Sequence, residues 1–499
     1  MTIPSRKPIQ SQLPTLGVGI TYSSAIEPML RQYPELFDVI EVEPQTMWIE
    51  TRNNAQPYRV TDQVLEHLAH LPGRKLIHSV GTPVGGTVRP DPAQCAVLRR
   101  TIAQLNAPWA SEHLSFNATS EFRTGFFLPP RQTPEGVEMV VRSIHALQAA
   151  LPVPVAVETG VNYLRPRADE MPDGAFVAAV VEAANCGLLL DLHNIFANGL
   201  NGRQSVEAFL AQLPLDRVWE IHLAGGFDME GFWLDAHSGA IPDPLFEIAK
   251  QVVPSLPNLK AMIFEIFPSF VPAVGFEAIR AQIERLHDLW QLRSKGREYK
   301  QLNLAQLQTP IGANDRISPT TWERALGELV IGRPSEGEVA HELTMDPGIG
   351  VIKRLIHEFR ASMIVSVLPL TSRLLMLALG PDVFCSILND FWSKTSPRLF
   401  ASTEAEAFAA YLEAFELKVP QLTKVLGFER AVLATLIDEQ PRLVVFDSDP
   451  LPMLRALAEG RLTDMPGSLG RFEIEVTPDN SIGATSIDLK AVQPVVPFH

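Results

Sequence analysis

The chain has 499 residues, of which 46% are hydrophobic and 20% charged, and this composition excludes a wholly disordered protein. Acidic residues outnumber basic ones by 57 to 42, and the net charge of -15 argues against a dedicated nucleic-acid-binding protein, which would carry a basic surface. Three scattered cysteines cannot form a disulfide framework, and no apolar stretch predicts a signal peptide or a membrane span. We therefore expect a cytoplasmic protein without a membrane partner.

Residues 14–292, which follow an N-terminal extension at 1–13, alternate short apolar runs with helical patterns. Strands alternating with helices predict a parallel sheet, and eight such units in roughly 250 residues predict an α/β protein with a (β/α)8 TIM barrel. A doubly wound open sheet is the alternative, but no glycine-rich phosphate loop follows the first run. The eight runs are 16–22, 37–43, 75–81, 109–116, 153–160, 187–194, 218–225 and 261–268.

The rest of the chain has a different pattern. Residues 293–315 are polar and lose the strand rhythm, which predicts a linker. Residues 316–499 are mainly helical in pattern, with strand-like segments at 442–447 and 471–478. They predict a second, mainly helical α+β domain.

Metal-binding side chains gather at the ends of the predicted strands and in the loop after the seventh. The carboxyl ends of barrel strands meet on one face, so these side chains should converge on one mouth. Mixed imidazole and carboxylate ligands suit Fe, Mn, Zn or Co, and ten candidates imply more than one ion. The candidates are His78, His113, Glu158, Asp191, His193, Asn194, His222, Asp235, His237 and Glu265.

A structural interpretation competes with the metal one. A single histidine at a strand end is more often a hydrogen-bonded structural residue, and Asp235 and His237 could form a simple turn. Burying this many ionisable groups without a metal, however, would cost several kcal/mol each, roughly, which favours the metal site. Glu43 and Glu112 are tentative catalytic residues, although Glu112 could equally support a ligand or the barrel wall.

The same segments resemble a known family. LIHSVG, WASEHLSF, VAVETGVNYL, GLLLDLHNIFANG, EIHLAGG, WLDAHSG and MIFEIF are similar, in order, to motifs of the multinuclear non-haem iron enzymes related to the methanobactin biosynthesis enzyme. The resemblance covers about residues 14–290. It implies a TIM barrel holding two or three irons, a mixed-valent Fe(II)/Fe(III) pair, O2 as co-substrate, and oxidation of a ribosomally made, cysteine-containing precursor peptide. The ten candidates above would then be the iron ligands.

The C-terminal region is similar to the separate subunit that accompanies these enzymes and helps hold the peptide. Here both parts are in one chain, so a separate partner subunit would be unnecessary. The chain also departs from the family pattern. Many relatives have His at the position of Glu43, Asn at that of His193, His at that of Gly226, and Asp at that of Phe267. The last difference removes the usual base, which Glu43 or Glu112 could replace.

Two other functions remain open from the residues alone. A barrel lined by His, Asp and Glu also suits a Zn- or Mn-dependent isomerase or hydrolase of the sugar isomerase or repair nuclease type. A nuclease would need a basic groove, which the net charge disfavours. A metal-binding scaffold without catalytic activity is the third possibility.

Overall fold

A computed structural model describes residues 13–295, 317–415, 417–463 and 468–478. Most of the predicted N-terminal extension, and residues 296–315 of the predicted linker, lie outside the described residues. The chain divides into two compact units, each described by itself below. The barrel unit comprises the described residues within Met1–Met47, Val60–Phe122 and Phe127–Ile352. The C-terminal unit comprises those within Trp48–Arg59, Arg123–Phe126 and Lys353–His499.

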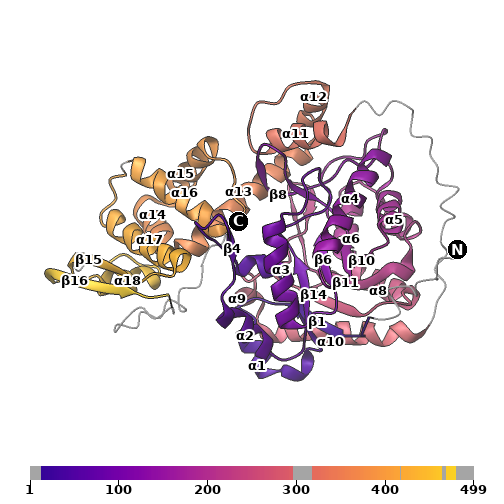
Figure 1. Ribbon diagram of the computed structural model, residues 1–499, viewed down its shortest axis with the longest axis horizontal. Coiled ribbons are helices and arrows are strands. Elements are labelled where there is room, and N and C mark those ends of the chain that lie inside the picture. Colours follow the sequence, from indigo (N-terminus) through magenta and orange to yellow (C-terminus); the bar gives the residue numbers. More distant parts are fainter. Residues whose placement is uncertain (1–12, 296–316, 416, 464–467, 479–499) are drawn as a thin grey trace. The chain divides into compact units, whose positions relative to one another are not determined.

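Eight parallel strands close into a barrel in the order β1-β14-β11-β10-β9-β6-β5-β2 (Figure 1). Each predicted run overlaps one of them, which confirms the TIM barrel. Strands buried on both faces explain why the runs are continuously apolar, because helices cover the outside while side chains fill the inside. The strands are β1 Gly17–Thr21, β2 Val39–Val42, β5 Arg74–Ser79, β6 Ala110–His113, β9 Val155–Glu158, β10 Gly187–Asp191, β11 Val218–Ala224 and β14 Ala261–Glu265.

The covering helices begin where the sequence supplies caps. The side chains of Thr61, Asp91, Thr133 and Asp191 each accept a hydrogen bond from a backbone N–H of the helix that follows. The helices are α1 Glu27–Gln32, α2 Asp62–His70, α3 Pro92–Leu105, α4 Pro134–Ala150, α5 Asp173–Ala184, α6 Leu192–Leu200, α7 Val206–Leu210, α8 Asp243–Val252, α9 Val271–Val274 and α10 Phe276–Trp290.

Short hairpins extend the loops that follow β2, β6 and β11. They are β3 Ile49–Glu50 with β4 Tyr58–Arg59, β7 Phe116–Ala118 with β8 Arg123–Leu128, and β12 Phe227–Met229 with β13 Phe232–Leu234. At the opposite end of the barrel an apolar cluster that includes Leu16, Trp109 and Trp219 fills the interior. The candidate ligands lie toward the other end, where the strands terminate.

The barrel unit extends beyond the predicted domain boundary. Helices α11 (Pro319–Val330) and α12 (Glu338–Thr344) belong to it, so the units divide after Ile352 and not at 293–315. The buried Trp322 of α11 explains this, because its indole N–H donates to the Pro129 carbonyl at 3.1 Å and its ring lies against Arg131. Glu323 accepts hydrogen bonds from the backbone and the hydroxyl of Thr87.

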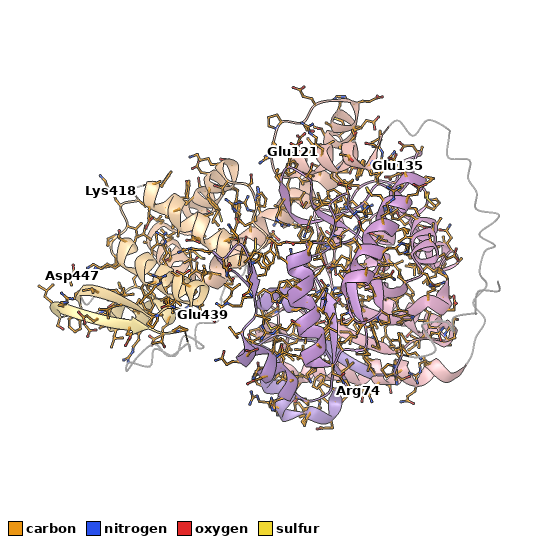
Figure 2. All side chains as sticks on the ribbon, in the orientation of Figure 1. Arg74, Glu121, Glu135, Lys418, Glu439 and Asp447 are labelled. Atoms are coloured by element: carbon orange, nitrogen blue, oxygen red, sulfur yellow. The ribbon has the colours of Figure 1, made fainter. Side chains whose placement is uncertain are left out.

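The helices of the C-terminal unit surround one apolar core, to which the antiparallel hairpin of β15 and β16 contributes side chains. Strand β15 contains the predicted segment 442–447, and β16 overlaps the predicted segment 471–478, so both predicted strands are confirmed. Charged side chains such as Lys418 in this unit and Glu135 in the barrel unit are exposed on their own units (Figure 2). The elements are α13 Gly348–Val367, α14 Pro369–Leu379, α15 Pro381–Lys394, α16 Ala401–Ala414, α17 Leu422–Asp438, β15 Arg442–Ser448, α18 Leu451–Ala458 and β16 Leu469–Val476.

Among the described helices, none is by itself long and apolar enough to cross a bilayer. Helices α13 and α14 meet the length and composition criterion only as a pair, and a bend of 110° separates them.

Candidate metal centre

The barrel brings the ten sequence-predicted ligands to its mouth. His78, His113, Glu158, Asp191, His222 and Glu265 lie at or near the ends of strands β5, β6, β9, β10, β11 and β14. His193 and Asn194 follow in the first turn of α6, and Asp235 and His237 follow β13. Most are buried, and the side chains of His113, Asp235 and His237 keep 18%, 19% and 13% exposure, so the centre reaches solvent beside these three.

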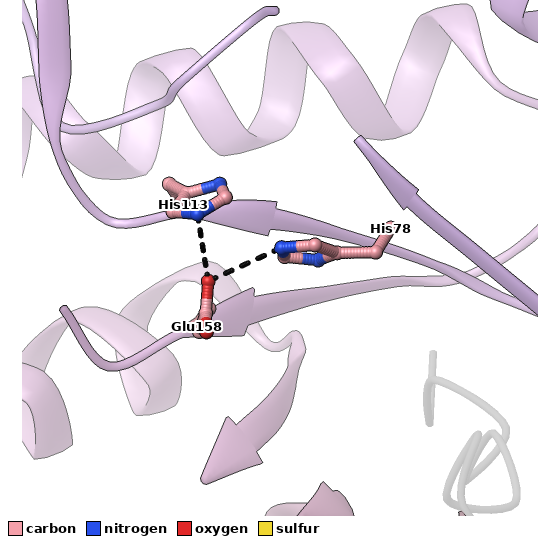
Figure 3. A group of neighbouring side chains, drawn as sticks. All are labelled: His78, His113 and Glu158. Atoms are coloured by element: carbon pink, nitrogen blue, oxygen red, sulfur yellow. Dashed lines mark ion pairs between the residues drawn. The ribbon is translucent and has the colours of Figure 1, made fainter. Parts of the chain in front are cut away.

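A first group consists of His78, His113 and Glu158 (Figure 3). Glu158 Oε2 lies 3.4 Å from His78 Nε2 and 3.0 Å from His113 Nε2. One ligand atom from each residue lies within 4.8 Å of the others, a spacing that one metal ion could span. These residues come from three adjacent strands, β5, β6 and β9.

Neighbouring groups orient the two imidazoles of this first group. His78 Nδ1 lies 2.8 Å from the Ser111 hydroxyl, which itself donates to the Ile77 carbonyl, so His78 Nδ1 carries the proton. His113 Nδ1 faces the Ser79 carbonyl at 3.3 Å. Both rings therefore direct Nε2 toward Glu158 and leave that nitrogen as the one a metal ion would bind, which is the arrangement of metal-binding histidines whose other nitrogen is hydrogen-bonded.

A second group consists of Glu158, Asp191 and His222, and it shares Glu158 with the first. His222 Nδ1 lies 3.6 Å from Glu158 Oε1 and 3.2 Å from Glu265 Oε2. The Asp191 carboxylate accepts from the backbone and side-chain N–H groups of Asn194, both at 2.8 Å. A carboxylate shared by two buried groups is the arrangement expected for a bridging ligand.

The loop after β13 completes the centre. His237 Nε2 lies 2.9 Å from Asp235 Oδ1 and 3.5 Å from Glu265 Oε2. His237 has a φ of 44°, a conformation that non-glycine residues adopt rarely, and such positions concentrate at functional sites. The Phe267 ring lies 4.5 Å from the His237 imidazole, and the Phe127 ring stacks 4.1 Å from that of His113.

The two tentative catalytic carboxylates have different surroundings. Glu112 is fully buried, and its oxygens accept hydrogen bonds from the Ser79 hydroxyl at 2.6 Å, from Thr82 and from the His113 backbone. Glu43 is half-buried immediately after β2. Burial and then the charge of Glu265 raise the pKa of Glu43, against the opposing charge of His78. Glu112 therefore holds the loop after β5 through its hydrogen bonds to Thr82, whereas the half-buried Glu43 side chain stays in contact with solvent.

Two carboxylates beneath His222 are not among the ten predicted ligands, although the sequence allows Glu41 a barrel salt bridge. His222 Nε2 lies 3.1 Å from Glu41 Oε1 and 3.7 Å from Glu220 Oε1, and Glu220 also accepts from the Trp109 indole. Burial is the largest influence that raises the pKa of Glu41, to about 8, and Glu220 adds to it. A signal was present, because Glu41 and Glu43, like Glu220 and His222, are two residues apart and so point to the same side of a strand.

The donor set fits metal ions. Among the ion pairs of the described residues, these carboxylates pair only with imidazoles and not with Lys or Arg. Four buried atoms, Glu158 Oε2, His222 Nδ1, His237 Nε2 and Glu265 Oε2, make no hydrogen bond. Each faces an oppositely charged group of the centre only as an ion pair, and buried polar atoms without hydrogen bonds are costly, so ions binding here would satisfy them.

The charges of the clustered side chains shift one another's pKa values. Burial alone would raise the pKa of Glu158, but the imidazoles of His113 and His78 hold it well below its usual range. Burial, together with the charges of Asp235 and Glu158, raises the pKa of Asp191. Perturbed groups of this kind concentrate at functional sites.

Fold and site together define a TIM barrel with a buried cluster of imidazole and carboxylate side chains at its mouth, in which Glu158 belongs to two groups that could hold a metal ion. The family model described as RiPP precursor modification enzyme MbnB/TglH/ChrH matches residues 17–274, more than half of the chain, and the chain belongs to this family. This confirms the family resemblance in the sequence motifs.

Curated relatives share the barrel region. A UPF0276 protein from Streptomyces avermitilis is 30% identical over 245 residues, which cover 47% of this chain and 48% of that protein. A UPF0276 protein from Chromobacterium violaceum is 30% identical over 225 residues, which cover 44% of this chain and 80% of that protein. The chain therefore spans about half the length of the first relative and most of the second.

Solved structures with a similar fold are much more distant. A D-psicose 3-epimerase crystal structure has 14% identity and a TM-score of 0.38, with 55% of this chain and 99% of that chain covered. A xylose isomerase domain protein from Planctomyces limnophilus has 13% identity and a TM-score of 0.37, with 57% and 99% covered. Similarity at this level carries no information about function.

Proposed function

We propose that this protein is an iron-dependent oxidoreductase that uses O2 to modify a ribosomally synthesised precursor peptide at cysteine. Membership of a family of RiPP precursor modification enzymes supports the substrate class. The observation that carries the metal part is the sharing of Glu158 between two buried groups of imidazole and carboxylate ligands. We also propose a cytoplasmic location, in keeping with three free cysteines.

We assign the metal-holding roles by position. His78, His113 and Glu158 would hold one ion, while Glu158, Asp191 and His222 would hold a neighbouring one. Asp235, His237, Glu265 and Asn194 lie beside the second group and would serve a third ion or complete the coordination of the second. Two or three irons there, as a mixed-valent Fe(II)/Fe(III) pair with or without a further ion, would supply one-electron chemistry toward O2.

The remaining residues would handle protons and water. We assign Glu43 as the proton acceptor for the substrate, because Glu112 is already fully hydrogen-bonded and Glu43 keeps solvent access at the mouth. A cysteine thiol that gives up its proton becomes a thiolate, the reactive and metal-binding form of the side chain. Phe127 lies against the His113 imidazole and Phe267 against that of His237, and both would shield the centre from bulk water.

We assign peptide docking to the C-terminal unit, in place of a separate partner subunit. Among the described strands, β15 and β16 pair only with each other, so each has one edge that no other described strand occupies. Leu443 and Val445 of β15 are 57% and 51% exposed, and Leu469 of β16 is 91% exposed. A free strand edge with exposed apolar side chains suits the addition of an extended peptide as a further strand.

The proposal is tested by metal analysis and oxygen uptake. The full chain, produced with iron under reducing conditions, should contain at least two irons per chain and consume O2 only when a cysteine-containing peptide is present. Glu158→Gln should lose iron and oxygen uptake, while Glu135→Gln, the same change at an exposed surface position, should retain both. Anaerobic turnover of a sugar or ester by a zinc- or manganese-loaded protein that is inactive with iron would instead establish the isomerase or hydrolase alternative.

A further inference from the structure

His193, one of the ten predicted ligands, has both ring nitrogens occupied by protein. It is fully buried in the first turn of α6. The indole Nε1 of Trp233 donates to His193 Nε2 at 3.1 Å, and His193 Nδ1 lies 3.0 Å from Asp235 Oδ1. An indole N–H can only donate, so Nε2 must offer its lone pair to it. The proton of the neutral ring is therefore on Nδ1, where it donates to Asp235.

This tautomer leaves His193 without a lone pair for a metal. His78 and His113 have the same protonated nitrogen, but their Nε2 atoms face Glu158 and not a hydrogen-bond donor. His222 Nδ1 makes no hydrogen bond at all. In His193, by contrast, the one nitrogen lone pair of the ring, on Nε2, already accepts a hydrogen bond from Trp233.

Trp233 is itself fastened to helix α6. Its backbone N–H donates to the Asn201 side chain at 2.7 Å, and its carbonyl accepts from the same side chain at 3.0 Å. Its ring meets the edge of Phe196 at 6.2 Å. Gly226 leaves room for the His193–Trp233 bond, because a Cβ there would lie 2.5 Å from the indole nitrogen and 2.7 Å from His193 Nε2.

We propose that His193 is a positioning residue and not a metal ligand. Trp233, His193 and Asp235 form a latch, a chain of two hydrogen bonds that holds the β12–β13 hairpin against α6 and directs the Asp235 carboxylate. Asp235 in turn contacts His237, so the latch sets the geometry of this side of the centre. Its effect on metal affinity rests on the function proposed above, whereas its effect on the hairpin does not.

Two variants break the latch at different links. Trp233→Phe removes the indole N–H and keeps an aromatic ring, and His193→Ala removes the imidazole. Phe196→Leu is the matched control, because it alters the same contact between α6 and β13 without touching a hydrogen bond. All three are made in the full chain, together with the double variant Trp233→Phe/His193→Ala, and each is titrated with Co2+.

Trp233→Phe and His193→Ala should both weaken cobalt binding by about 10–100-fold, the usual effect of losing a group that orients a metal ligand. Both should still reach the wild-type number of ions at saturating cobalt. The cobalt affinity of the double variant should equal that of the single variant with the lower affinity, because both substitutions break the same chain of hydrogen bonds. Wild-type affinity in Trp233→Phe, or the loss of one whole ion at saturation in His193→Ala, would overturn the latch.

Amide hydrogen exchange of residues 227–238 in the metal-free protein separates this inference from the proposed function. Exchange should be faster in Trp233→Phe and His193→Ala than in wild type and Phe196→Leu. If the two latch variants exchange their amides faster but neither they nor the wild type binds cobalt, the latch is supported and the proposed metal site is refuted. Unchanged exchange in both variants would overturn the latch whatever metal the protein binds.

Discussion

Loading the centre with metal should release protons, so the apparent metal affinity should rise with pH. Burial alone would lower the pKa of His78, but the carboxylates of Glu158 and Glu41 raise it to about 10. The pKa values of His222 and His237 are raised well above the usual range in the same way, the first by Glu265 and Glu41 and the second by Asp235 and Glu265. At pH 7 the metal-free protein therefore holds protons on these imidazoles.

Each of these protons must leave before a nitrogen lone pair can bind a metal. One displaced proton raises the apparent binding constant about tenfold per pH unit, so His78 alone gives roughly 100-fold between pH 6.5 and 8.5. The rise should continue toward pH 10, because a raised pKa keeps the imidazole protonated up to that value. Full loading also displaces the protons of His222 and His237. The logarithm of the overall apparent binding constant should then rise by up to about three per pH unit, one for each displaced proton.

The assay is a Co2+ titration of the metal-free chain against a chromophoric chelator at several pH values. Calorimetry in two buffers with different heats of ionisation counts the released protons independently. Glu135→Gln, altered only at an exposed position, should follow the wild-type curve. Affinity that is independent of pH, with heats that are the same in both buffers, would refute the protonated cluster.

Three further outcomes are expected. His113→Ala and His222→Ala should each lose metal while circular dichroism shows a folded barrel, and wild-type metal content in either variant would refute its role as a ligand. Glu43→Gln should reduce peptide-dependent oxygen uptake by about 10²–10⁴-fold, as for the loss of a general base, at unchanged iron content, and full activity would exclude Glu43 as the proton acceptor. Trp322→Ala should cost about 3–5 kcal/mol in urea unfolding of the barrel unit, and Trp322→Phe about 1 kcal/mol through the lost hydrogen bond to Pro129. Equal, small losses in both would mean that α11 does not belong to the core of that unit.

The barrel could be predicted from the sequence because the pattern is local. Each buried parallel strand is a largely apolar run, and several helices begin at a capping residue such as Thr61 or Thr133. The gathering of the candidate ligands at the barrel mouth could be predicted for a related reason, since the fold carries the end of every strand to one face. The domain boundary could not be predicted, because α11 belongs to the barrel unit through Trp322 and Glu323, whose partners are about two hundred residues away in the chain.

The sequence by itself determined which residue types reach the mouth of the barrel, and the tertiary structure decided what each of them can do there. Glu43 and Glu112 are equivalent candidates by residue type, yet the hydrogen bonds from Ser79 and Thr82 occupy only Glu112. His78 and His193 both follow the strand-end pattern, but an imidazole has one lone pair to give when its other nitrogen holds a proton. Which atom takes that lone pair depends on neighbours brought in by folding, and for His193 that neighbour is the indole of Trp233, forty residues along the chain.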